Sequence, residues 1–152
     1  FKYFIDLGAD INFVDNKGWS VLMELCRMNK INGIKILLKY NVNVNYTPLY
    51  SIFNYRFPIN RATALFISVV EDRYNITELL LKNNANVNKQ NNFDETPLII
   101  AVKNENIDIV KLLIKYGANI IYNSDKDKNK LIYSYDYLNE DSPIRKYLIE
   151  NI

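Results

Sequence analysis

Residues 96–119 read TPLIIAVKNENIDIVKLLIKYGAN, and this stretch carries the clearest structural signals in the chain. Thr96 is a natural helix N-cap, and Pro97 suits the first helical position because no hydrogen-bond donor is lost there. Gly117 permits the left-handed backbone that ends a second helix. That second helix carries an apolar stripe at helical spacing, made of Ile107, Ile109, Val110, Leu112, Leu113 and Ile114. The stretch therefore predicts two helices, of which the second must bury one side.

The markers of this stretch return along the whole chain. Four variants of one pentapeptide are Gly8-Ala9-Asp10-Ile11-Asn12, Asn41-Val42-Asn43-Val44-Asn45, Asn84-Ala85-Asn86-Val87-Asn88 and Gly117-Ala118-Asn119-Ile120-Ile121. They end at residues 12, 45, 88 and 121, which lie 33, 43 and 33 residues apart. A second marker agrees, because Ser20, Thr63 and Thr96 each stand 25 residues before the end of the next pentapeptide. The register predicts repeating units, with ten extra residues between Asn45 and Thr63.

With these residues at this spacing, the sequence resembles the ankyrin repeat family, whose unit carries T-P-L-H-x-A, then I-V-x-x-L-L, then G-A-D-h-N. The third full unit matches best, through Thr96-Pro97-Leu98, Ala101, Asn104, Ile109-Val110-Lys111-Leu112-Leu113 and Gly117-Ala118-Asn119. The resemblance covers nearly the whole chain. It implies an all-α, ankyrin-type helix-turn-helix solenoid with short finger loops and one ten-residue insertion.

We expect one ankyrin repeat domain over residues 1–152, built from stacked units that share a core. Its expected parts are the second half of a repeat (1–12), a repeat (13–45), a repeat with an insertion near 46–60 (46–88), a repeat (89–121) and a degenerate C-terminal capping repeat (122–152). The chain is thus expected to begin in mid-repeat. In the last repeat we expect a tyrosine-rich helix from Leu131 to Leu138 and a second helix from Ile144 to Glu150, capped by Ser142 and Pro143.

Two departures from the family pattern carry structural predictions. The family's histidine is absent, and Met23, Phe66, Ile99 and Ile132 stand in its place, so we expect apolar packing there. The first full unit has Leu25 where a small residue is typical and Gly33 where a large one is typical. Because cores tolerate swaps that conserve volume, we expect these two residues to exchange volume between neighbouring helices.

Composition argues against most catalytic and charge-driven functions. Nineteen basic and seventeen acidic residues give a net charge of +2, which is too balanced to indicate nucleic acid or an anionic membrane. The absence of histidine removes the usual metal ligand and general base. The single cysteine, Cys26, is expected in the core, and we find neither a membrane-spanning run nor a leader peptide. These features predict a soluble, cytoplasmic protein that is not an enzyme and uses no cofactor, metal or small-molecule substrate.

One segment imitates a metal site. Residues 125–129, with Asp136 further on, copy the oxygen spacing of a calcium loop. Lys130 stands where that loop needs glycine, and the bidentate glutamate is missing. We therefore interpret this segment as a solvated loop.

The resemblance implies that the protein binds another protein on a concave surface formed by the fingers and the first helices. The candidate residues carried over from the family are Asn16, Lys17, Trp19, Arg27, Met28, Asn92, Phe93, Glu95, Lys103 and Asn104. We expect Trp19 and Phe93 to occupy equivalent, exposed finger positions, where a large ring needs a neighbour or a partner. Replacing both residues by alanine is expected to weaken the binding of a partner protein without much loss of folding stability.

The insertion at residues 46–60 adds further candidates, Tyr50, Tyr55 and Arg56, because tyrosine and arginine are frequent at interface hot spots. The alternative is that Thr47-Pro48-Leu49 caps a short extra helix whose Ile52, Phe53 and Phe57 cover the stack. A second function also stays open, in which the array is a structural spacer of a longer solenoid whose function lies in another domain.

Overall fold

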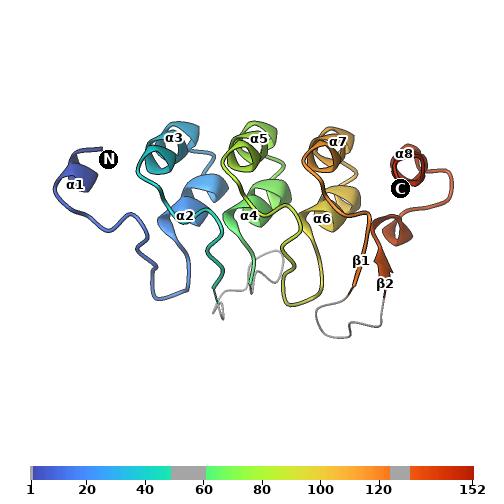
Figure 1. Cartoon of the computed structure of the whole chain (residues 1–152), viewed down its shortest axis with the longest axis horizontal. Helices are drawn as coiled ribbons and strands as arrows, with labels where there is room; N and C mark the ends of the chain where they lie inside the picture. The colour runs from blue at the N-terminus through green and yellow to red at the C-terminus, as the bar shows by residue number, and fades with distance from the viewer. Residues whose placement is uncertain (1, 49–60, 124–130) are drawn as a thin grey trace.

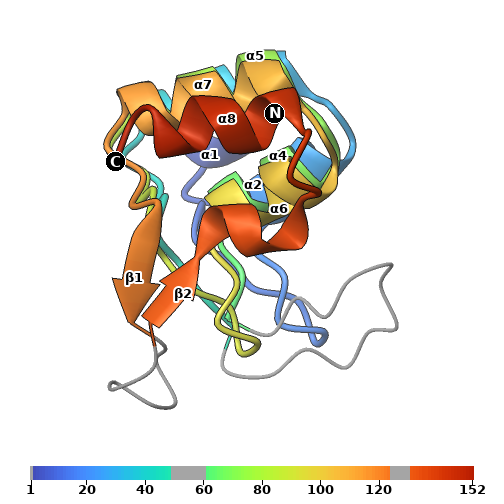
Figure 2. The same ribbon diagram turned by 90° about the vertical axis from the view of Figure 1, so that its right-hand side faces the viewer.

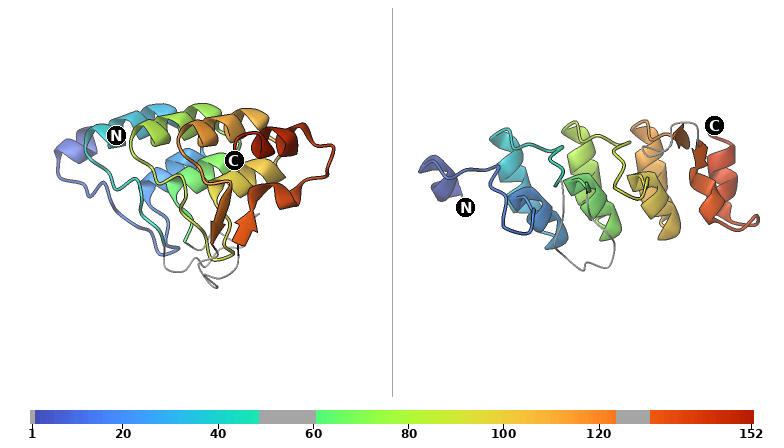
Figure 3. Two further views of the ribbon diagram at one scale, coloured as in Figure 1. Left: turned by 45° about the vertical axis from the view of Figure 1, so that its right-hand side comes forward. Right: turned by 90° about the horizontal axis from the view of Figure 1, so that it is seen from below.

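The computed structural model describes residues 2–48, 61–123 and 131–152. Its elements are α1 (Lys2–Asp6), α2 (Val21–Arg27), α3 (Ile31–Lys39), α4 (Ala64–Val70), α5 (Tyr74–Lys82), α6 (Pro97–Lys103), α7 (Ile107–Lys115), β1 (Ile121–Asn123), β2 (Leu131–Tyr133), the 3-10 helix η1 (Ser134–Tyr137) and α8 (Pro143–Ile149). Helices α2, α4 and α6 form an inner row, and α3, α5, α7 and α8 form an outer row (Figure 1). Seen from below in Figure 3, the helix pairs follow one another along the long axis. The predicted helix-turn-helix solenoid is confirmed.

The inner helices begin where the sequence markers place them. The hydroxyls of Ser20, Thr63 and Thr96 accept hydrogen bonds from the backbone amides three residues later. These caps satisfy amides that have no partner within the helix, and Pro97 follows Thr96 at the first turn as expected. The Ser142 hydroxyl caps α8 in the same way. The caps therefore fix the start of each of these helices at its predicted residue.

The core lies between the two rows and between successive helix pairs. Leu22, Met23 and Cys26 of α2 are fully buried, as is every residue of α4 or nearly so. Met23, Phe66 and Ile99 are each 0% exposed, which confirms apolar packing at three of the positions where the family has histidine. Burial also raises the pKa of the Cys26 thiol, which keeps it protonated and supports a packing role.

The predicted exchange of volume in the first full unit is confirmed. A Cβ atom built on Gly33 in α3 lies 3.0 Å from Cδ1 and 3.3 Å from Cδ2 of Leu25 in α2. The methyl groups of Leu25 thus fill the space that a side chain at residue 33 needs. In the other units the large residue stands on the outer helix, where Ile76 and Ile109 are buried.

The C-terminal unit differs from the prediction at its first helix. Residues 131–133 form strand β2, which pairs antiparallel with β1 through Ile121↔Tyr133, Tyr122↔Ile132 and Asn123↔Leu131, and only residues 134–137 are helical, as η1. The expected helix from Leu131 to Leu138 is therefore wrong. A β-branched residue followed by an aromatic one suits a pleated strand better than a helix, and pairing with β1 satisfies the backbone. Helix α8 confirms the second predicted helix to within one residue at each end.

The asparagine that ends each of the first three pentapeptides joins one unit to the next. The Oδ1 atoms of Asn12, Asn45 and Asn88 accept from the backbone amides of residues 43, 86 and 119 at 2.7, 2.7 and 2.8 Å. The Nδ2 atoms of Asn45 and Asn88 also donate to the carbonyls of residues 84 and 117. We call these contacts the asparagine ladder. It has no asparagine at residue 121, where Ile121 begins strand β1.

Replacing Asn45 by alanine is expected to lower the free energy of unfolding by about 1 kcal/mol. The substitution removes two hydrogen bonds between units, and the exposed groups left behind recover part of the loss by binding water. Chemical denaturation followed by circular dichroism measures the change. Asn75→Ala is the control, because Asn75 is an exposed residue of α5 outside the ladder. Equal stability of the two variants would show that the ladder contributes nothing.

Left-handed backbone recurs at equivalent turns. Between the inner and outer helices, Asn29, Asp72 and Glu105 have φ of 57°, 53° and 53°. Asparagine and aspartate tolerate this conformation, whereas it strains a glutamate. We expect Glu105→Gly to raise the free energy of unfolding by about 0.5–1 kcal/mol. Lys111→Gly, in the middle of α7, is the control and is expected to cost about 1 kcal/mol. A loss of stability in both variants would contradict the prediction that the left-handed backbone strains Glu105.

Candidate partner-binding face

The candidate residues lie on the inner row and on the loops that precede it. We call residues 13–19 the first finger and residues 89–95 the third finger, and we call the surface that they form with α2, α4, α6 and η1 the inner face. In Figure 2, which looks along the array, the inner row lies between the outer row and these loops. The inner face is therefore built from segments that lie far apart in the sequence and occupy equivalent positions in successive repeat units.

Each finger is folded around one side chain. In the first finger, Oδ1 of Asp15 accepts from the amides of Lys17 and Trp19 at 2.9 and 2.8 Å. In the third finger, Oδ1 of Asn91 accepts from the amides of Phe93 and Glu95 at 2.8 and 3.0 Å. The two patterns superpose Lys17 on Phe93 and Trp19 on Glu95. The expectation that Trp19 and Phe93 occupy equivalent positions is therefore wrong.

The two rings also differ in exposure. Trp19 is 7% exposed and belongs to the hydrophobic core, although one edge lines a small hollow with Phe13 and Val21. Phe93 is 50% exposed. The expectation that Trp19 is exposed is therefore wrong. Trp19 stands at the end of the finger, where its backbone pairs with that of Asp15 and its ring turns inward. Phe93 sits nearer the tip and keeps half of its surface in solvent.

Three elements meet around Lys103. Its Nζ atom lies 2.6 Å from Oε1 of Glu95 in the third finger and 4.3 Å from the centroid of the Tyr137 ring in η1. The other carboxylate oxygen of Glu95 accepts from Nδ2 of Asn91 at 2.9 Å. The structure therefore brings the predicted residues Glu95 and Lys103 together. It adds Tyr137, 45% exposed, which sequence analysis missed because it assigned that residue to an ordinary helix.

Helix α2 carries a second ion pair at the position equivalent to Lys103. The guanidinium of Arg27 donates from Nε to Oε2 of Glu24 at 2.9 Å and also pairs with the other carboxylate oxygen. This hydrogen bond holds the pKa of Glu24 below its ordinary value, and the nearby charge of Arg27 adds to the effect. Met28, the next residue, is 48% exposed.

The asparagine candidates have different environments. Nδ2 of Asn104 lies 3.3 Å from Oδ1 of Asp72 and 3.4 Å from the carbonyl of Val69, so it joins α6 to the preceding unit. Asn92 is half-buried, and Asn16 is exposed at the first finger. Tyr50, Tyr55, Arg56 and most of the 46–60 insertion lie outside the described residues, as does the calcium-like segment 125–129.

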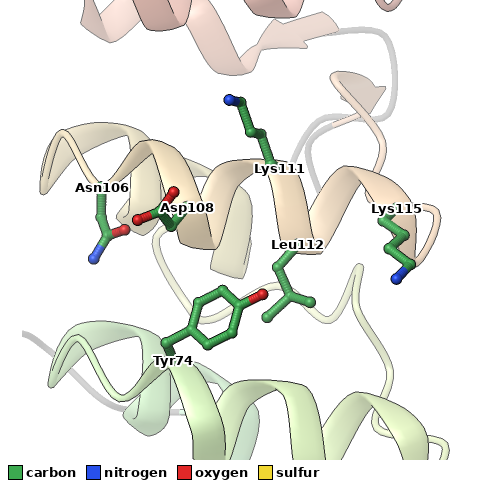
Figure 4. A pocket seen from close by; sticks show the side chains of 6 residues that line it. All are labelled: Tyr74, Asn106, Asp108, Lys111, Leu112 and Lys115. Carbon is green, nitrogen blue, oxygen red and sulfur yellow. The ribbon is translucent and has the colours of Figure 1, made fainter.

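One hollow on the described surface lies away from the inner face, between α5 and α7. It measures about 400 Å³ and is lined by Tyr74, Asn106, Asp108, Lys111, Leu112 and Lys115 (Figure 4). In Figure 4 the Tyr74 ring approaches Leu112, whereas the ammonium groups of Lys111 and Lys115 point away from it in different directions. A small-molecule site needs polar groups that converge on an apolar pocket, and this hollow lacks that arrangement.

The described residues hold no group of three or more carboxylate, cysteine or histidine side chains placed to bind a metal ion. Within the same ranges, no helix has the length and apolar character needed to span a membrane.

Comparison with known families supports the family resemblance of the sequence. The family model for ankyrin repeats (3 copies) matches residues 1–91 and also residues 52–124. No curated protein matches the sequence. Ankyrin repeats are generally protein-protein interaction modules, and members of the family are typically not catalytic.

Proposed function

Because the chain belongs to the ankyrin repeat family, we propose that it is a non-catalytic binding module whose protein partner docks on the inner face. One observation carries the choice of face. Phe93 stands two residues before Glu95 in the third finger, the Tyr137 ring lies against Lys103, and both rings are about half exposed. Aromatic side chains on a rigid frame are the usual anchors of an interface, since they bury a large area at a small entropic cost.

The frame supports this role through its rigidity. The third finger is held by Asn91, and Tyr122 of β1 donates a hydrogen bond from its hydroxyl to the carbonyl of Asp94 at 2.9 Å. Burial raises the pKa of Tyr122, so the hydroxyl keeps its proton at neutral pH. A finger fixed before binding loses little conformational entropy when a partner docks. The side chains that the partner covers would thus be Phe93 and Tyr137, with Met28 toward the N-terminal end.

Affinity capture with matched variants tests the proposal. Three forms of the chain are immobilised: the wild type, Phe93→Ala and Tyr74→Ala. The proteins that each form captures are quantified by mass spectrometry. Tyr74 is a suitable control because it is 42% exposed on the outer row, close to the 50% of Phe93. A protein that binds the wild type and Tyr74→Ala, and binds Phe93→Ala at least tenfold more weakly, a loss of about 1.4 kcal/mol, supports the proposal. A partner lost only from Tyr74→Ala would place the interface on the outer row and contradict it.

A further inference from the structure

The charges of the inner helices are already paired within the molecule. Arg27 holds Glu24 on α2, and Lys103 holds Glu95 between α6 and the third finger. The Glu95 side chain is only 14% exposed, so its charge faces Lys103 more than solvent. Lys103 also has the Tyr137 ring on another side. Both inner-helix cations therefore have a carboxylate partner before anything binds.

The middle of the inner row carries no charge at the equivalent positions. The register places Ile67 of α4 at the position of Glu24, and it places Val70 at the position of Arg27 and Lys103. Helix α6 has Ile100 where α2 has Glu24. Along the inner row, α2 carries the Arg27–Glu24 ion pair, α4 carries no charge, and α6 carries Lys103, which is paired with Glu95. Lys17, at the finger position of Phe93, has a contact of its own as well.

Large apolar or aromatic side chains are exposed beside both pairs. Met28, Phe93 and Tyr137 are 48%, 50% and 45% exposed, which is high for side chains of their size in a folded protein. Covering such surface is favourable by roughly 25 cal/mol per Å². Burial of apolar area and ring contacts are therefore favourable terms that this face offers to a partner.

Given the proposed function on which this step rests, we infer that the partner contacts the inner face through an uncharged segment with aliphatic or aromatic side chains. An acidic segment must displace Glu95 from Lys103 or Glu24 from Arg27, and it then leaves the displaced carboxylate without its partner. That exchange of one ion pair for another gains little. An uncharged segment leaves both pairs intact and covers Met28, Phe93 and Tyr137.

Selection of peptides tests the inference with a defined probe. A random library of displayed peptides of about twelve residues is selected against the whole chain, and the binders are synthesised. Their affinities are measured from about 0.05 to about 0.5 M NaCl, a range over which interactions between exposed charges become largely screened. The affinity of each peptide is also measured for three variants: Phe93→Ala, Tyr74→Ala and Lys103→Met/Glu95→Gln. The last of these removes the ion pair without changing the net charge. Circular dichroism establishes that every variant is folded.

The outcomes separate this inference from the proposed function. We expect the selected peptides to have a low net charge and affinities that change less than about twofold over the salt range. Their affinity for Lys103→Met/Glu95→Gln should differ from that for the wild type by about threefold or less. Their affinity for Phe93→Ala should be at least tenfold lower. Acidic peptides that lose affinity tenfold with salt and bind poorly to Lys103→Met/Glu95→Gln would overturn the inference while leaving an inner-face site. Binders that are insensitive to Phe93→Ala, or an absence of binders, would contradict the proposed function itself.

Discussion

Trp19→Ala is expected to lower the free energy of unfolding by about 3–5 kcal/mol, the usual cost of removing a buried aromatic side chain. The Trp19 ring is 7% exposed and packs in the core, and its backbone closes the first finger through hydrogen bonds with Asp15. Alanine leaves a cavity that the finger can fill only by shifting its hydrogen-bonded turn. Because this is the chain's single tryptophan, unfolding is followed by circular dichroism and not by tryptophan fluorescence.

Two controls make the result specific. Trp19→Phe keeps an aromatic ring in the cavity and is expected to retain most of the stability. Phe93→Ala removes a ring from the third finger, but that ring is 50% exposed, so the expected loss is below about 1 kcal/mol. If Trp19→Ala and Phe93→Ala unfold at the same denaturant concentration, the inward position of Trp19 is refuted.

The contrast between these two rings shows where sequence reasoning fails. Counting from the repeat markers places both residues in finger loops, and that placement is right. The direction of each side chain depends on the turn inside the loop, which Asp15 and Asn91 fix by accepting two backbone amides. The two rings stand two positions apart in this turn, and that difference separates a buried ring from an exposed one. Counting back from the equivalent caps reveals the difference in position, because Trp19 stands one residue before Ser20 and Phe93 three residues before Thr96.

The fold itself was predictable because its determinants are local and repeated. Ser20, Thr63 and Thr96 cap their helices, and the pentapeptides end in asparagines that bridge to the next unit. Only the first helix of the C-terminal unit differs from the prediction, because Ile121 replaces the asparagine of the ladder there and the sequence has no serine or threonine at the cap position before residue 131. There the β-propensity of Ile132 and Tyr133 and the pairing with β1 decide the structure.

The candidate site was predictable only in part. Glu95 and Lys103 are eight residues apart, and the family pattern assigns both to the binding surface without relating them to each other. Their 2.6 Å contact depends on how the third finger folds back over α6. Tyr137 comes from η1, which has a conformation that the repeat pattern does not contain. Contacts between a finger and a neighbouring unit are thus tertiary information.

The second large effect is expected at Leu25 and Gly33. Leu25→Ala alone is expected to cost about 2 kcal/mol, because its methyl groups fill the space beside Gly33. Gly33→Ile alone is expected to cost about 1–3 kcal/mol, since the new side chain must displace Leu25 atoms only 3.0 and 3.3 Å from its Cβ. The double variant restores the small inner and large outer arrangement of Ala101 and Ile109, so we expect stability within about 1 kcal/mol of the wild type.

Denaturant unfolding of the four proteins gives the coupling energy directly. If the two residues share one volume, the losses of the single variants cancel in the double variant, and the coupling energy approaches their sum, about 3–5 kcal/mol. The double variant also removes a glycine from the first turn of α3, which adds up to about 0.5 kcal/mol in helix propensity when isoleucine replaces it. Additive losses would mean that the space beside Gly33 is filled by something other than Leu25. The first unit would then have a different core from its neighbours and not the same core with its large and small residues exchanged.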